Sequence, residues 1–104
     1  MKTWKSATLS DLQTYESISK VFQQHCYLLD IFFEKEKPRI RARSEKMLKQ
    51  VSDFSHGEII LIKIALDIWS GSGNAFVWEM IEFLDQQDFF NVLNALASLR
   101  KNRG

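Results

Sequence analysis

This chain contains very few residues that interrupt a helix. Its 104 residues include one proline, Pro38, and four glycines, at positions 57, 71, 73 and 104. Folds made of many short strands need such residues more often, because Gly and Pro supply the backbone angles of tight turns. The sequence therefore predicts a few long helices, with breaks at Pro38, near residues 52–57 and at residues 70–74.

The composition supports one domain with an apolar core. Hydrophobic residues make up 45% of the chain and aromatic residues 12%, which excludes a disordered chain. The formal net charge of +1 excludes a globally basic protein that coats nucleic acid and an acidic protein that mimics it. A single cysteine excludes an internal disulfide and a site of several thiolates. We expect a single all-α domain over residues 1–104, a small bundle of about five helices.

The first predicted helix is long. It begins near Thr8 or Ser10, where residues three positions later complete a capping box. It runs to about residue 36, because Pro38 disfavours helical geometry just before itself. About 26 residues at roughly 1.5 Å each give roughly 39 Å, more than a domain of this size is wide. Its apolar seam comprises Leu12, Tyr15, Ser19, Phe22, Cys26, Leu29 and Phe33. We expect the overhanging part to be covered by another protein surface.

Four further helices are predicted after Pro38. An amphipathic second helix covers the basic segment 39–49. Ser55 and Glu58 form a capping box at the start of a central third helix, which is apolar nearly all round. A fourth helix over residues 75–84 follows Asn74 as N-cap, and Asp85 caps a fifth. The polar stripe of this fifth helix consists of Asn91, Asn94, Ser98 and Lys101.

The sequence predicts no catalytic, cofactor or metal site. Cys26 follows His25 directly, but neighbouring residues on a helix point about 100° apart and cannot face each other. Two histidines and one cysteine do not show the spacing of a zinc site. The carboxylates Glu79, Glu82, Asp85 and Asp88 are spaced by three, which we interpret as a solvated strip. We therefore expect a protein that is not an enzyme.

The remaining feature is an excess of apolar helix surface. A bundle of this length buries one central helix, and its outer helices normally show broad polar faces. Excess apolar surface usually marks a protein–protein interface. The sequence thus predicts a non-enzymatic protein-interaction module, a homodimer formed through the long first helix. The predicted interface residues are Leu28, Ile31, Phe32 and Phe33.

Nucleic-acid binding is the alternative function. Residues 35–49 contain seven basic and two acidic side chains, a net charge of +5. Such a patch can neutralise phosphates, although acidic helices of the same or a neighbouring subunit can equally balance it. The candidate residues are Arg39, Arg41, Arg43, Lys46 and Lys49. In addition, the segment FFNVLNALASLRKNRG loosely resembles the recognition helix of winged-helix domains, which implies a C-terminal trihelical unit with polar residues facing a DNA groove.

No targeting signal is predicted. Lys2 and Lys5 are not followed by an apolar stretch of the kind found in signal peptides. The most apolar stretch, residues 59–69, has eleven residues and contains Lys63 and Asp67, whereas a bilayer needs roughly 20. We therefore expect a cytoplasmic protein without a membrane segment.

Overall fold

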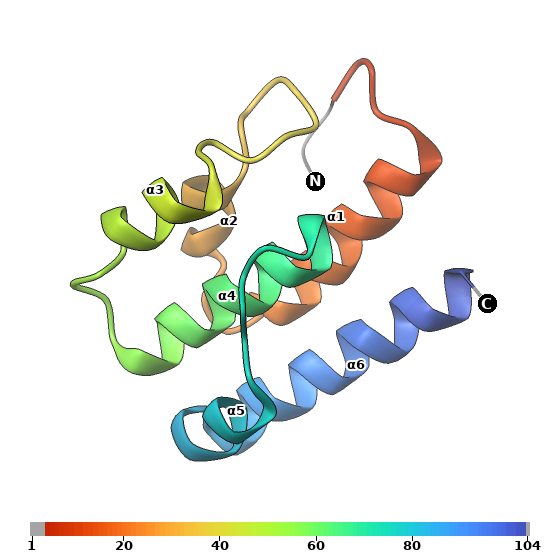
Figure 1. Cartoon of the computed structure of the whole chain (residues 1–104). Helices are drawn as coiled ribbons and strands as arrows, with labels where there is room; N and C mark the ends of the chain where they lie inside the picture. Colours follow the sequence, from red (N-terminus) through yellow and green to blue (C-terminus); the bar gives the residue numbers. More distant parts are fainter. Residues whose placement is uncertain (1–3, 104) are drawn as a thin grey trace.

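The computed structural model describes residues 4–103 and has six α-helices and no named strand in that range. The helices are α1 (Leu9–Val21), α2 (Tyr27–Phe32), α3 (Ser44–Gln50), α4 (His56–Ser70), α5 (Val77–Phe83) and α6 (Gln86–Arg103). Helix α1 packs against α6 and α4, while α3 and α5 pack against α4 (Figure 1). The predicted all-α bundle is confirmed.

Three predicted helix starts are confirmed. Thr8 caps α1 in a capping box with Asp11, and Ser55 caps α4 in a capping box with Glu58. The side chain of Asp85 accepts a hydrogen bond of 2.7 Å from the backbone N–H of Asp88 at the start of α6. Each side chain pairs with a backbone group that would lack a partner at the end of a helix.

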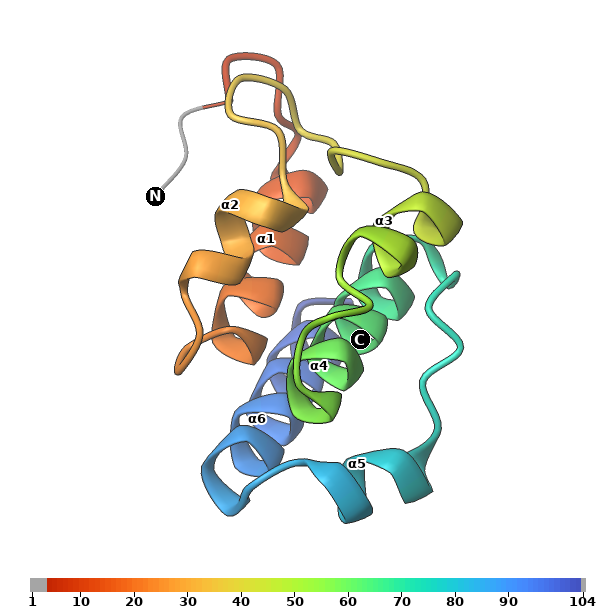
Figure 2. The ribbon, with the colours of Figure 1, turned by 90° about the vertical axis from the view of Figure 1, so that its left-hand side faces the viewer.

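The single long first helix is wrong. Helix α1 ends at Val21, the chain turns through residues 22–26, and α2 begins at Tyr27. The chain reverses its direction there (Figure 2). As a result, the ring of Phe32 lies 5.9 Å from that of Phe22, and the ring of Phe33 lies 5.1 Å from that of Tyr15. The reversal lets Phe22, Phe32 and Phe33 enter one core, which a straight helix does not allow.

The predicted second helix is wrong in its first half. Phe33 and Ile40 form an isolated antiparallel bridge on either side of Pro38. Backbone N–H groups of Glu34 and Arg41 donate to the carbonyls of Arg39 and Phe32, both at 2.9 Å. These hydrogen bonds between the two sides of the Pro38 turn replace helical ones, so α3 starts only at Ser44.

Helix α4 is the predicted central helix. Its buried residues are Ile60, Leu61, Ile62, Ile64, Ala65 and Leu66. It ends at Gly71, whose φ of 70° is left-handed and suits glycine. A Cβ atom at Gly73 would lie 1.8 Å from the carbonyl oxygen of Lys63, so only glycine lets the returning chain pass this close.

Helix α5 starts later than predicted, at Val77 and not at residue 75. The carboxylate of Asp67 accepts hydrogen bonds from the backbone N–H groups of Gly73, Asn74 and Ala75, at 2.8, 3.1 and 2.9 Å. These bonds hold residues 73–75 against α4, so Asn74 does not act as the N-cap. Over residues 4–103, none of the helices combines the length and the apolar character needed to cross a membrane.

Candidate protein-binding surface

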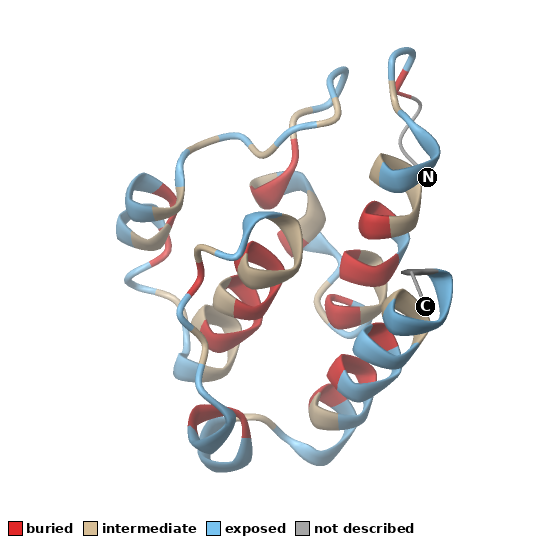
Figure 3. Cartoon of the chain, turned by 45° about the vertical axis from the view of Figure 1, so that its right-hand side comes forward, coloured by how far each residue is buried: buried red, intermediate tan, exposed pale blue. Residues whose placement is uncertain are grey.

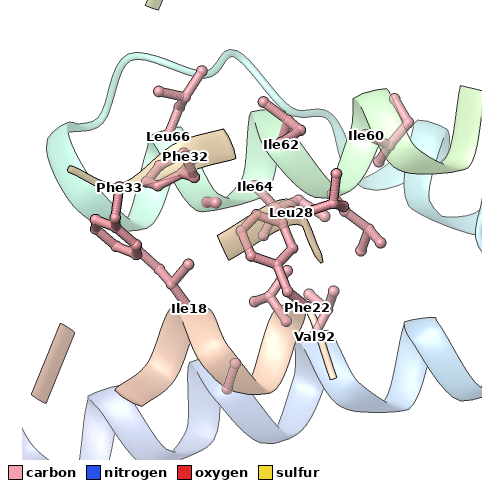
Figure 4. Packing of buried hydrophobic residues seen from close by; sticks show 14 of the residues in the cluster. Ile18, Phe22, Leu28, Phe32, Phe33, Ile60, Ile62, Ile64, Leu66 and Val92 are labelled. Carbon is pink, nitrogen blue, oxygen red and sulfur yellow. The ribbon is translucent and has the colours of Figure 1, made fainter. Parts of the chain in front are cut away.

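The predicted interface on the first helix lies in the core. Its residues are Leu28, Ile31, Phe32 and Phe33, of which Ile31 is half-buried and the other three are 0% exposed. Phe33 packs edge-on against Trp4 and Trp69, with ring centroids 5.3 and 5.2 Å apart. Figure 4 shows Phe32 and Phe33 between α1 and α4. Leu28, Phe32 and Phe33 have no exposed surface to offer a second chain, so the predicted interface is wrong for these three residues. The reversed chain supplies the cover that the prediction assigned to a neighbouring subunit.

The predicted basic residues do not share one helix face. Arg39 lies in the turn around Pro38 and pairs with Glu34, which lowers the pKa of that carboxyl group. The Nε atom of Arg41 donates to the backbone carbonyl of Asp30. Arg43 directly precedes α3, and Lys46 and Lys49 lie on it, all three exposed. The patch is thus divided between a turn and a short helix.

A different surface exposes the apolar side chains that need cover. Eight large apolar residues of α5, its N-cap and α6 are between 37% and 68% exposed. We call them the α5–α6 surface: Phe76, Val77, Trp78, Ile81, Phe83, Phe90, Leu93 and Leu96. Figure 3 shows the outer faces of both helices as exposed. Monomeric proteins rarely leave a large contiguous apolar patch in water.

An apolar groove of about 380 Å³ joins the two helices of this surface. Its lining residues are Ile64, Asp67, Ile68, Ala75, Val77, Met80, Val92, Leu96 and Leu99. Asp67 is the one charged residue among them, and its carboxylate is already bonded to the three backbone N–H groups of residues 73–75. The groove can therefore accept an apolar side chain without leaving a charge unpaired.

The exposed face of α6 follows from how α6 packs on α1. Ser17 Oγ donates to the carbonyl of Ala95, and Lys20 Nζ donates to Ser98 Oγ, both at 2.9 Å. Asn91 is also buried on this side. Half of the predicted polar stripe thus faces α1 or the core, and the opposite face carries Phe90 and Leu93. The winged-helix resemblance requires Asn91 and Ser98 to face a groove in DNA, which this packing prevents.

The two ends of α6 carry opposite charge. Glu82 and Asp85 are exposed beside its first turn, and Arg100 and Lys101 are exposed in its last turns.

The predicted solvated row of four carboxylates is only half exposed. Glu79 and Asp88 are buried, so the interpretation as a solvated strip is wrong for these two residues. Glu79 lies 3.4 Å from Lys63 Nζ and accepts a hydrogen bond from the backbone of Phe76. Asp88 lies against the turn between α1 and α2.

A polar network surrounds that turn. Asp88 lies 3.0 Å from His25 Nε2 and accepts a 2.9 Å hydrogen bond from Gln24. The hydroxyl of Tyr27 donates to Glu58, which raises the pKa of Tyr27 to about 12 and lowers the pKa of Glu58. Through these hydrogen bonds, the network connects the start of α2 to the first turns of α4 and α6, and we assign it a structural role. Cys26 is exposed, contrary to its predicted place in an apolar seam. Within the described part of the chain, no cluster of three or more His, Cys, Asp or Glu residues could hold a metal ion.

The sequence contains the signal for the α5–α6 surface but not its location. Phe90, Leu93 and Ala97 recur at steps of three and four, a helical row that is visible without a structure. The same helix also carries a row with Val92, Ala95 and Leu99, and only the tertiary packing decides which row is buried. In comparisons with known proteins, no family model, curated protein or solved structure matches this chain.

Proposed function

We propose that this chain is a non-enzymatic protein-binding module and that it binds its partner through the α5–α6 surface. The observation that carries the proposal is the exposure of eight large apolar side chains on two consecutive helices. The surface includes Trp78 and the phenylalanines Phe76, Phe83 and Phe90, which belong to residue types that are enriched in interface cores. Covering them with a partner removes apolar area from water, which stabilises a complex.

The extent of the surface is suited to a protein partner. A standard interface takes about 800 Å² from each protein. Eight large side chains, each more than one third exposed, provide apolar area of that order. The groove adds a concave site beside the convex face of α6, and anchor residues of a partner typically fill such sites. The sequence predicted that the partner is a second copy of the chain.

Site-specific photo-crosslinking in the native host tests the proposal. A photoreactive phenylalanine analogue replaces Ile81, which is 66% exposed on α5. The matched control carries the analogue at Leu9, which is 72% exposed on α1 and lies outside the surface. We expect discrete protein adducts at position 81 that are absent at position 9. Equal adduct patterns at the two positions, or none at either, would overturn the proposed function.

A further inference from the structure

We propose that the partner on the α5–α6 surface is a second copy of this chain, with the two α6 helices antiparallel about a two-fold axis near Leu93. This inference rests on the proposed function and names the partner and its orientation. In this arrangement, Phe90 of each copy meets Ala97 of the other, and the acidic end of each α6 meets the basic end of its counterpart.

The outer face of α6 has the spacing that helix pairing requires. Phe90, Leu93, Ala97 and Arg100 follow one another at steps of three, four and three residues and are all exposed. On a helix, these steps place the residues in one row along the axis. The opposite side of α6 is already occupied by α1, through the contacts of Ser17 and Lys20 with residues 95 and 98. The row is therefore the free side of a helix that is fixed on its other side.

The charges on α6 select the antiparallel orientation. Asp85 lies eight residues before Leu93, and Arg100 lies seven residues after it. At about 100° per residue, both lie on the same side of the row through Leu93. When two copies pair antiparallel with Leu93 opposite Leu93, the two-fold axis keeps each residue on its own side of the contact, so Asp85 of each copy comes beside Arg100 of the other. A parallel pair would place like charges together at both ends. The helix dipoles add to this preference, because antiparallel helices bring opposite partial charges together.

The same register satisfies the apolar residues. Phe90 lies three residues before Leu93 and Ala97 lies four residues after it, on the same side of the row, so the pairing brings each phenylalanine to Ala97 of the other copy. A two-fold axis makes each contact twice and uses the same patch on both chains, so the assembly closes as a dimer.

The first test compares dimerisation of charge variants of the full chain at low salt. Light scattering should show a wild-type dimer, and Arg100→Glu/Lys101→Glu should weaken dimerisation by about tenfold or more, because each repulsive pair occurs twice. Adding Asp85→Asn should restore part of the affinity. Asparagine is as good an N-cap as aspartate, so this change removes the charge and keeps the start of α6. Circular dichroism of each variant confirms that the helices are intact.

The second test is disulfide formation across the two-fold axis. In a Cys26→Ser background, Leu93→Cys should form a disulfide-linked dimer on mild oxidation, because the two copies of this residue face each other. Asn94→Cys is the matched control, since it is exposed on the same helix but about 100° further round. Faster linkage through Cys at position 93 than at position 94 supports the register. Equal rates would contradict it.

Two results would overturn the dimer. One is a wild-type chain that stays monomeric at several hundred micromolar. The other is a dimer whose affinity is unchanged by Arg100→Glu/Lys101→Glu and in which Leu93→Cys forms no disulfide between the two copies. If Ile81 crosslinks only to a different protein, the dimer is wrong and the proposed function stands. If position 81 gives no adducts beyond those at position 9, the proposed function fails as well.

Discussion

The Nε2 atom of His25, in the turn between α1 and α2, lies 3.0 Å from a carboxylate oxygen of Asp88, in the first turn of α6. The two residues are 63 positions apart in the chain. Asp88 also accepts a hydrogen bond from Gln24 and is only 4% exposed. The turn that interrupts the predicted long helix is therefore bonded to a helix at the other end of the sequence.

Asp88→Ala should destabilise the fold through this turn. The change removes a carboxylate acceptor from two side chains. Both donors are partly exposed and can bond to water in the variant, so each lost bond costs less than the roughly 1.5–3 kcal/mol that a hydrogen bond to a charged group contributes. We expect the free energy of unfolding to fall by about 2 kcal/mol in urea titrations. Glu82→Ala is the control, because Glu82 is exposed, and such changes usually stay within about 0.5 kcal/mol. Equal losses in the two variants would contradict the role given to Asp88.

Phe33→Ala should damage the monomer and not an interface. The ring is fully buried and packs against Trp4, Tyr15 and Trp69. Truncating a buried phenylalanine costs about 3–5 kcal/mol, so we expect a large loss in thermal unfolding temperature at every protein concentration. Leu9→Ala, at a residue that is 72% exposed, should leave it nearly unchanged. A Phe33→Ala chain that folds as stably as wild type would contradict the core position.

Local features of this fold were predictable from sequence. The caps at Thr8, Ser55 and Asp85 depend on residues within four positions of each other, and all three are observed. The central position of α4 follows from its almost continuous apolar composition. These signals need no knowledge of what packs against them.

The chain reversal and the binding surface depend on distant contacts. The heptad-like seam through Phe22, Cys26 and Phe33 is a valid helical pattern, yet the turn at residues 22–26 puts Phe22 and Phe33 in one core and leaves Cys26 exposed. Likewise, α6 has two apolar rows, and polar contacts from Ser17 and Lys20 fix which one faces α1. Sequence periodicity shows that rows exist and does not say which of them is covered.

Tyr27→Phe should have a pH-dependent effect on stability. The Tyr27 hydroxyl donates to Glu58 and lowers the pKa of this carboxyl group below its ordinary value of 4.5. A lowered pKa in the folded state stabilises the fold above the unfolded value, and this contribution is lost as the pH falls through the folded value. Urea titrations should show a loss of about 1 kcal/mol or less for the variant at pH 7. The difference should shrink below pH 4.5.

Glu58→Gln provides the control for this titration. Glutamine keeps a capping side chain at this position of α4 but carries no charge to titrate. In this background the effect of Tyr27→Phe should be nearly the same at pH 7 and pH 3.

At high pH, the direction of the stability change follows from the titration of Tyr27 itself. Its pKa of about 12 is raised above the ordinary tyrosine value of 10.0, so the stabilisation is present below pH 10 and declines as the pH rises towards 12. If Tyr27→Phe has the same effect at all pH values in the chain that retains Glu58, the proposed hydrogen bond between Tyr27 and Glu58 is contradicted.

Nucleic-acid binding through the basic residues is open to direct measurement. Arg43, Lys46 and Lys49 are exposed around α3, whereas the side chains of Arg39 and Arg41 are engaged within the chain. We expect only weak binding to duplex or single-stranded DNA at 150 mM salt in fluorescence anisotropy. Arg43→Gln/Lys46→Gln/Lys49→Gln should not alter stability by more than about 0.5 kcal/mol. Tight binding that falls steeply with salt and is lost in this triple variant would favour the nucleic-acid function over the proposed one.

Replacing Asn91 should stabilise the chain. Asn91 is buried where α6 packs into the fold, and its Nδ2 atom has no hydrogen-bond partner among the described residues. A buried donor without a partner costs about 1–3 kcal/mol relative to an apolar group of similar shape. Its Oδ1 atom accepts a hydrogen bond from Gln87, which is exposed and can bond to water instead. Asn91→Leu should therefore raise the free energy of unfolding by about 1 kcal/mol, measured by urea titration.

Two comparisons separate this effect from a change in volume or helix propensity. Asn91→Ala removes the same amide without adding bulk, so a gain in Asn91→Ala but not in Asn91→Leu would indicate crowding at this position. Asn94→Leu makes the same substitution at an exposed position one turn away, where no desolvation penalty is relieved. Its gain should reflect helix propensity alone, a few tenths of a kcal/mol. If Asn91→Leu and Asn91→Ala both lower stability, the buried amide has a partner that stabilises the fold, and its desolvation is not a cost.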